Sequence, residues 1–329
     1  MKKSHFVCKA LALSFLFLSL SFSQLYAAGW TEKIKQKTEA AEKKVNSATK
    51  KVSEAVDSRI TPSESTKNSI LTTSEKVEKA KEEITPEQKY YIGRAVAAKI
   101  FSGTPRANNN TTIEDYLNKI CQALVINSDG LIPYNGFHVA LLNSNDLNAV
   151  STPGGHILVS KGLVLAAESE DQLAAVLAHE ISHIQLEHSV KSIKSARTVD
   201  AFFSVVETSK TIATNGKSDS SSSFSQLTDD LTDTLVSSGY SQTSEFEADS
   251  NAVELMAKAG YNPEAMTAML DVLDKKLGSS NTGWGKTHPS PSTRKKAVKP
   301  AVLMYKMKSG DDTSSVRQAR FKKAIASIK

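Results

Sequence analysis

The chain has 329 residues, 40% of them hydrophobic, which is enough for one sizeable folded domain. Its formal net charge of +6 is too small for a protein whose main partner is nucleic acid. It contains two cysteines, so the composition excludes a domain held together by several disulfides, and we expect Cys121 to be a small core residue.

Residues 1–28 have the pattern of a secretory signal peptide. Three lysines make a positive start, Leu11–Phe22 is a short apolar run, and the small residues Ala27 and Ala28 follow. The apolar run is short and rich in serine, which favours cleavage over a retained membrane anchor. We therefore expect a periplasmic or secreted protein, and loss of the three lysines lowers its formal charge from +6 to +3.

Residues 29–84 are rich in lysine, glutamate, alanine, serine and threonine. Small apolar residues recur at alternating spacings of four and three from Ile34 to Ala55, which predicts a helix with one weakly apolar face. So thin a face favours a solvated helical arm or linker, and a docking helix or a removable pro-segment is the alternative. Thr85-Pro86 marks the next boundary, because proline suits the first turn of a helix.

Residues 85–300 differ in character, and we assign them to the main domain. Apolar residues at helical spacing predict helices over residues 91–101, 113–124, 161–167, 245–258 and 263–277. Short apolar runs predict strands over residues 137–142, 147–151 and 156–159. The last two strands are joined by Pro153-Gly154-Gly155, and a type II turn there requires a positive φ at the glycine. Residues 301–329 form a basic tail to which no activity is assigned.

A further helix is predicted after Ser169, and it carries the motif His179-Glu180-x-x-His183. Ser169 is a good N-cap, and Gln172 three residues later completes a capping box. Histidines four residues apart lie on one face of a helix, so both can bind one zinc ion while Glu180 acts on a zinc-bound water. The alternative is a pair of core histidines, which would leave several buried polar groups needing partners at once.

A catalytic zinc ion needs a third protein ligand and a position open to water. The best candidate is Glu245, which shares a small, apolar helix face, whereas Glu247 lies on a polar face. A buried carboxylate without a cation is costly, which favours metal binding over a role for Glu245 in capping its own helix. Asp249, one turn further on, can accept the spare N–H of a zinc-bound histidine. His188, five residues after His183, is expected to face away from the metal.

With these motifs the chain resembles the gluzincin metallopeptidase family that includes HtpX, CaaX prenyl protease and the Oma-type proteases, and it is most similar to the soluble periplasmic branch. The resemblance runs from about Pro86 to Pro300. Further segments that carry it are Asn148-Ala149, Pro153-Gly154-Gly155, Gly162-Leu163, Ala259-Gly260-Tyr261-Asn262-Pro263 and Thr287-His288-Pro289 with Arg294. Together with the predicted elements it implies an α+β, mostly helical fold, in which a zincin-like core has a small antiparallel sheet beside the motif helix.

The resemblance implies one zinc ion per chain, bound by His179, His183 and Glu245, with Glu180 as the catalytic base. It also suggests that His288 approaches the metal, either as a transition-state donor or as an inhibitory fourth ligand. A histidine exposed on the surface is the alternative for this residue.

Two more regions belong to the site that the resemblance implies. Arg294 lies behind His288 in the same closing motif and is a second candidate for the catalytic site. The strand that contains Asn148 and Ala149 is expected at the edge of the cleft, where an extended substrate would bind by strand addition.

The sequence thus predicts a zinc-dependent endopeptidase for unfolded or misassembled envelope proteins. The rival hypothesis is a metal-binding periplasmic chaperone or assembly factor with little proteolysis, but pure binding would need no base at Glu180. Polypeptide is the expected partner and nucleic acid is not. Peripheral association with a membrane stays open, and the sequence does not determine the oligomeric state.

Overall fold

The computed structural model describes residues 83–107, 111–195, 228–229, 232–278, 284–306 and 314–328. The predicted signal peptide, nearly all of the predicted arm and the serine tract near residue 220 therefore lie outside the described residues. Among the helices that are described, none combines the length and the apolar character required to cross a membrane.

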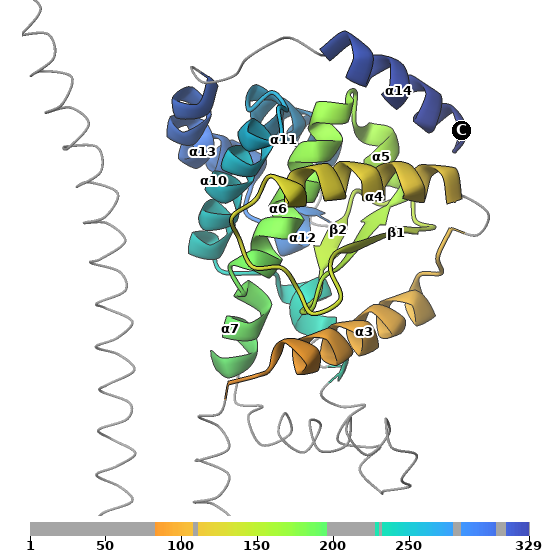
Figure 1. Cartoon of the computed structure of the whole chain (residues 1–329), viewed down its shortest axis with the longest axis vertical. Helices are drawn as coiled ribbons and strands as arrows, with labels where there is room; N and C mark the ends of the chain where they lie inside the picture. Colours follow the sequence, from red (N-terminus) through yellow and green to blue (C-terminus); the bar gives the residue numbers. More distant parts are fainter. Residues whose placement is uncertain are drawn as a thin grey trace, which may run out of the picture. The chain divides into compact units, whose positions relative to one another are not determined.

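Helices make up most of the described chain (Figure 1). The elements in order are α3 Pro86–Gly103, α4 Thr111–Ile126, β1 His138–Leu142, β2 Ala149–Ser151, β3 His156–Ser160, α5 Lys161–Ala166, α6 Glu170–Gln185, α7 His188–Ser195, the π-helix η1 Thr234–Ser238, α10 Gln242–Lys258, α11 Glu264–Leu277, α12 Trp284–Thr287, α13 Pro291–Lys306 and α14 Ser314–Ala326. This arrangement confirms the predicted α+β, mostly helical fold.

The sheet has three strands in the order β1-β3-β2 within the described residues. Strand β3 pairs antiparallel with β2 but parallel with β1, so the sheet is mixed rather than antiparallel throughout. The reason is the order of the strands in the sheet. The segment 143–148 leaves room for one strand between β1 and β2, and β3 occupies that middle position. Gly154 has a φ of 81°, which confirms the positive φ predicted for the turn between β2 and β3.

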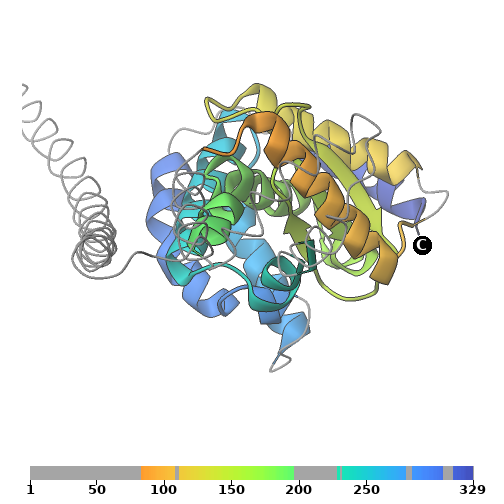
Figure 2. The same ribbon diagram turned by 90° about the horizontal axis from the view of Figure 1, so that it is seen from below.

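Both faces of the sheet are buried, because residues of each strand alternate between two hydrophobic clusters. Ile157 and Val159 of β3 join the cluster formed with α4 and α6, whereas Leu158 joins the cluster formed with α3. Seen from below, α3 lies over the sheet, where it contacts β3 (Figure 2). Cys121 of α4 is buried in the first cluster, as expected for a small core residue.

Helix α6, which carries the histidine motif, lies between the sheet and the helices α10 and α11 (Figure 1). It is buried from Glu170 to Ile184. The predicted N-cap is confirmed, since the Ser169 hydroxyl accepts from the backbone N–H of Gln172 at 3.2 Å. The Gln172 side chain, however, accepts from the N–H of Glu168 rather than from the N-cap residue.

The C-terminal region packs on the same core. Helix α13 continues through residue 300, and Phe321 and Ile325 of α14 are buried with residues of α4 and α6. Arg320 of α14 forms an ion pair with Glu170, at the start of α6. The domain limits stay a prediction, but the basic tail supplies part of the hydrophobic core.

Replacing Arg320 by alanine is expected to destabilise the fold by about 1–3 kcal/mol, because a fully buried carboxylate would lose its cationic partner. Glu170 would retain only the hydroxyls of Tyr116 and Tyr261, at 2.9 and 3.2 Å, among the partners described for it. Urea unfolding measures the loss, and Lys322→Ala, at an exposed position of the same helix, is the control. Equal stability of both variants would contradict a role for this pair.

Candidate metal centre

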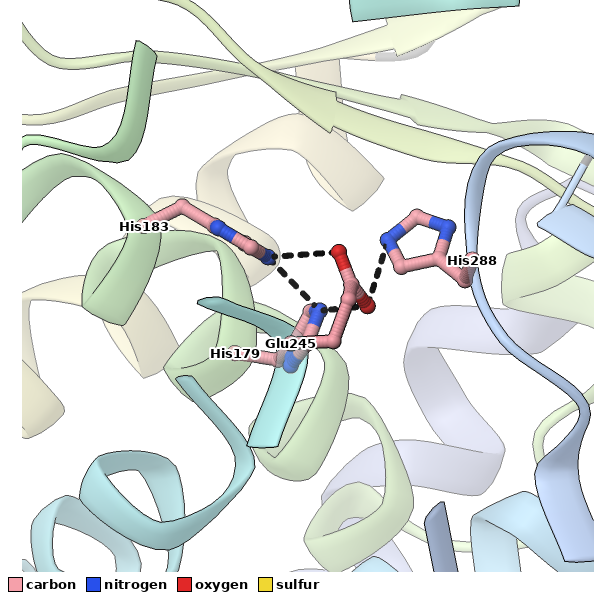
Figure 3. Close-up of side chains that lie close together, drawn as sticks. All are labelled: His179, His183, Glu245 and His288. Atoms are coloured by element: carbon pink, nitrogen blue, oxygen red, sulfur yellow. Dashed lines mark hydrogen bonds and ion pairs between the residues drawn. The ribbon is translucent and has the colours of Figure 1, made fainter. Parts of the chain in front are cut away.

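Four side chains from distant parts of the chain point toward one another (Figure 3). His179 and His183 come from α6, Glu245 from α10, and His288 from the turn after α12. One potential ligand atom of each lies within 4.8 Å of those of the other three. The two histidine Nε2 atoms are 3.0 Å apart, and the Glu245 oxygens lie 3.5 Å from His183 Nε2 and 3.6 Å from His179 Nε2.

The donor set fits a metal ion. Glu245 is 0% exposed, and neither of its carboxylate oxygens has a hydrogen-bond partner. Burial raises its pKa well above the usual value, although the charge of Arg294 opposes this effect. A divalent cation between the carboxylate and the imidazoles would satisfy these atoms together, and imidazole nitrogen with carboxylate oxygen is a set that zinc prefers.

The histidines are held in the neutral form that metal binding requires. Burial lowers the pKa of His179 to about 4, with a further contribution from the charge of Arg294. The pKa of His183 lies well below its usual value because of burial and the neighbouring histidines. The Nε2 lone pairs are therefore available at neutral pH.

Glu180 lies beside this cluster without being one of its four members. It is 1% exposed and its Oε1 atom has no hydrogen-bond partner. Burial raises its pKa to about 7, against the opposing hydrogen bonds of Ser151 and the charge of Arg294. A carboxyl group with such a pKa can both accept and return a proton near neutral pH.

Asp249 lies at Nδ1 of His179, and Nη2 of Arg294 lies 3.1 Å from Nδ1 and 3.5 Å from Nε2 of the same ring. Asp249 Oδ1 is 3.0 Å from His179 Nδ1, and Arg294 donates to both Asp249 oxygens, from Nε at 2.9 Å and from Nη2 at 2.5 Å. Burial alone would raise the pKa of Asp249, but the charge and hydrogen bonds of Arg294 outweigh it and the pKa is lowered. A charged carboxylate is thus available to accept a proton from the His179 ring.

His288 is enclosed rather than exposed, with 6% of its side chain accessible, which argues against the surface alternative. Its ring stacks on Trp284 at a centroid distance of 4.0 Å and an interplanar angle of 10°. Its Nε2 atom lies 3.8 Å from Glu245 Oε2. The backbone N–H of Trp284 in turn donates to Leu147 O at 2.7 Å, which ties this segment to the chain before β2.

Asn148 and Ala149 lie outside the four-residue cluster, at the beginning of β2. Ala149 is buried and contributes to the core, as the rest of β2 is buried, whereas Asn148 just before the strand is half-buried. Among the described residues, β2 pairs with β3 alone, and its other edge carries no strand. Strand β2 packs against α6, the motif helix, and also contacts η1.

Two aromatic residues of the site could not be found by motif searching. Trp284 holds His288, and Tyr240 stacks on His183 with a centroid distance of 4.2 Å and an interplanar angle of 19°. Gly239 has a φ of 69°, and a Cβ atom there would lie 1.8 Å from the Thr287 carbonyl oxygen. This glycine is the local signal that the chain before α10 runs close to α12.

His188 is not a member of the four-residue cluster, as expected, but it contacts the far side of the His183 ring instead of turning away from this region. Helix α6 ends at Gln185, and Glu187 adopts a φ of 56°, so α7 starts at His188 in a new direction. As a result, His188 Nδ1 lies 2.8 Å from His183 Nδ1. Helical periodicity did not predict this contact, because it assumed that the helix continued.

Comparison with known proteins agrees with these motifs. The model of the family described as Peptidase family M48 matches residues 112–302. The beta-barrel assembly-enhancing protease of Escherichia coli (strain K12) is 27% identical over 191 residues, which are 56% of this chain and 38% of that protein. The metalloprotease YcaL of the same organism is 25% identical over 215 residues, covering 65% of this chain and 80% of YcaL.

A eukaryotic relative is also similar. The mitochondrial metalloendopeptidase OMA1 of Schizosaccharomyces pombe is 30% identical over 149 residues, covering 45% of this chain and 41% of that protein. The chain spans less than half the length of this relative and of the assembly-enhancing protease. The matched family region contains all four residues of the cluster.

Proposed function

The chain belongs to peptidase family M48, and from this premise we propose that it is a zinc-dependent metalloendopeptidase. The observation that carries the proposal is the convergence of His179, His183 and Glu245, whose buried carboxylate has no hydrogen-bond partner. The rival hypothesis of a metal-binding chaperone is not favoured, since the matched family is a peptidase family, its relatives are named as proteases, and pure binding would need no base at Glu180.

In this mechanism Glu180 moves the proton. A bound zinc ion would supply Lewis acidity, which acidifies water and polarises the substrate carbonyl. Glu180 accepts a proton from the attacking water and passes it to the nitrogen of the leaving amine. Asp249, held by Arg294, accepts a hydrogen bond from His179 Nδ1 and thereby keeps the Nε2 atom turned toward the cluster.

The edge of β2 that faces away from β3 is the proposed site for the substrate backbone. An extended segment that pairs with Asn148 and Ala149 would add a strand to the sheet beside α6. This mode selects unfolded polypeptide, because a folded domain offers few free strand edges. We therefore propose unfolded or misassembled envelope proteins as substrates, in keeping with the name of the beta-barrel assembly-enhancing protease.

We also propose a periplasmic or secreted location, which rests on the signal-peptide pattern of residues 1–28. Export would bring the chain to the envelope substrates inferred above. Fractionation of cells that express the full chain tests this, and recovery of the uncleaved chain in the cytoplasm would contradict it.

Zinc analysis combined with a cleavage assay tests the proposed activity. The purified chain should bind one zinc ion and cleave casein, which is unfolded, much faster than a stably folded protein of similar size. A chain that holds one zinc ion and binds casein without cleaving it would instead support the chaperone hypothesis.

Replacing His288 by alanine is expected to increase casein cleavage several-fold. With His288 the cluster has four protein donors, whereas a catalytic zinc site leaves one position for water. Initial rates with zinc-loaded protein measure the effect, and the zinc content serves as a control. A fall in kcat at unchanged zinc content would indicate a transition-state donor rather than an inhibitory ligand.

A further inference from the structure

A chain of three side chains extends outward from His183, on the side opposite the cluster. His183 Nδ1 lies 2.8 Å from Nδ1 of His188, and His188 Nε2 lies 3.3 Å from Oε2 of Glu247. His188 is 1% exposed, whereas the Glu247 side chain is 47% exposed. These three side chains therefore connect the buried cluster to the surface of α10.

Hydrogen-bond chemistry determines where the protons sit in this arrangement. Two Nδ1 atoms at 2.8 Å need one proton between them. If His183 gives its Nε2 lone pair to a metal, its own proton is on Nδ1, and His188 Nδ1 must accept it. The proton of His188 is then on Nε2, which donates to Glu247.

The two histidines of α6 thus have different outer partners. His179 meets a carboxylate directly, with Asp249 Oδ1 at 3.0 Å from its Nδ1 atom. Among the described residues, Nδ1 of His183 instead meets an imidazole, which in turn meets a carboxylate. Tyr240 stacks on the face of the His183 ring. The stack therefore limits the tilt of this ring, and the contact with His188 limits its rotation.

We propose that His188, backed by Glu247, is a positioning residue that orients His183 for metal binding. The proposal rests on the proposed zinc site and deepens it, since it concerns how strongly the metal is held. Outer partners of metal-bound histidines typically contribute about 10–100-fold to metal affinity. Glu247 acts through His188, so its contribution should disappear when His188 is absent.

The test measures the zinc dissociation constant of the full chain by competition with a chelator. His188→Leu should weaken zinc binding by about 10–100-fold, and Glu247→Ala by a smaller factor. Glu254→Ala is the matched control, because Glu254 is a half-exposed carboxylate on the same helix that pairs with Lys258. In the His188→Leu background, Glu247→Ala should cause no further loss.

Two more measurements separate orientation from a purely structural role. The visible spectrum of the cobalt-loaded chain should change in His188→Leu and Glu247→Ala but not in Glu254→Ala. Thermal unfolding of the metal-free chain should be the same for Glu247→Ala and the control. If His188→Leu does not fold, Glu247→Ala carries the test, since its side chain is half-exposed.

Wild-type affinity and an unchanged cobalt spectrum in Glu247→Ala and in any folded His188→Leu would overturn this proposal alone. Independent, additive losses in the double variant would also overturn it. A wild-type chain that binds no zinc would overturn the proposed metal site as well, so the two failures are distinguishable.

Discussion

Replacing Glu180 by glutamine should lower kcat for casein cleavage by about 10²–10⁴-fold while one zinc ion stays bound per chain. Glutamine has the size of glutamate and keeps a carbonyl oxygen, but it cannot take a proton from water. The fold should tolerate the change, because Oε1 of Glu180 has no hydrogen-bond partner to lose and the carbonyl oxygen of glutamine can keep the hydrogen bonds with Ser151. Burial disfavours the charged form of Glu180, as its raised pKa indicates, and the neutral glutamine avoids this desolvation cost.

The measurement is the initial rate at saturating casein, with zinc content and thermal unfolding recorded on the same samples. Glu254→Gln is a matched control for the chemical change, since it alters a carboxylate on α10 that pairs with Lys258. Equal rates for Glu180→Gln and the wild type would remove Glu180 from the mechanism. A variant that has lost its zinc would show instead that Glu180 helps to hold the metal.

Removing zinc with a chelator is expected to abolish cleavage and to lower the Tm on the order of 10 °C. A ligand that binds only the folded state stabilises it by roughly 4 kcal/mol at 1,000 times its Kd. In the metal-free chain the buried Glu245 carboxylate has no compensating partner, and burial raises its pKa. Readdition of zinc should restore both the Tm and the activity.

Ligand variants distinguish this effect from nonspecific action of the chelator. His179→Ala and Glu245→Ala should each lose stoichiometric zinc, and their Tm should no longer respond to chelation. His138 lies on β1, outside the cluster, so His138→Ala should keep its zinc and serve as the control. Full zinc occupancy in both ligand variants would show that the proposed ligand set is wrong.

Local patterns predicted the three strands and the helices α3 to α6, α10 and α11, but not α12, α13 or α14. The helix that carries the motif begins after the N-cap Ser169, and the strands lie within two residues of their predicted starts. Short-range spacing is sufficient for this, because capping and periodicity involve residues a few positions apart. The parallel pairing of β1 with β3 was not predictable, since alternation identifies a strand without identifying its neighbour.

The site divides in the same way. That His179 and His183 share a face, and that Glu245 rather than Glu247 points inward, follows from the 3.6-residue period of the helix. The stacking of Tyr240 on His183 depends on contacts between segments far apart in the chain and left no periodic signal. The position of His188 depends on a single backbone angle, the positive φ of Glu187.

The sequence alone therefore determined the motif helix, the helix that carries Glu245, and which side chains of each point inward. This is possible because residue spacing along a regular helix fixes the direction of each side chain. Only the tertiary structure decided that His288 lies against Glu245, that Arg294 holds Asp249, and which partners stand behind the two histidines. These contacts join α6, α7, α10, α13 and the turn after α12, and packing between distant segments has no counterpart in local spacing.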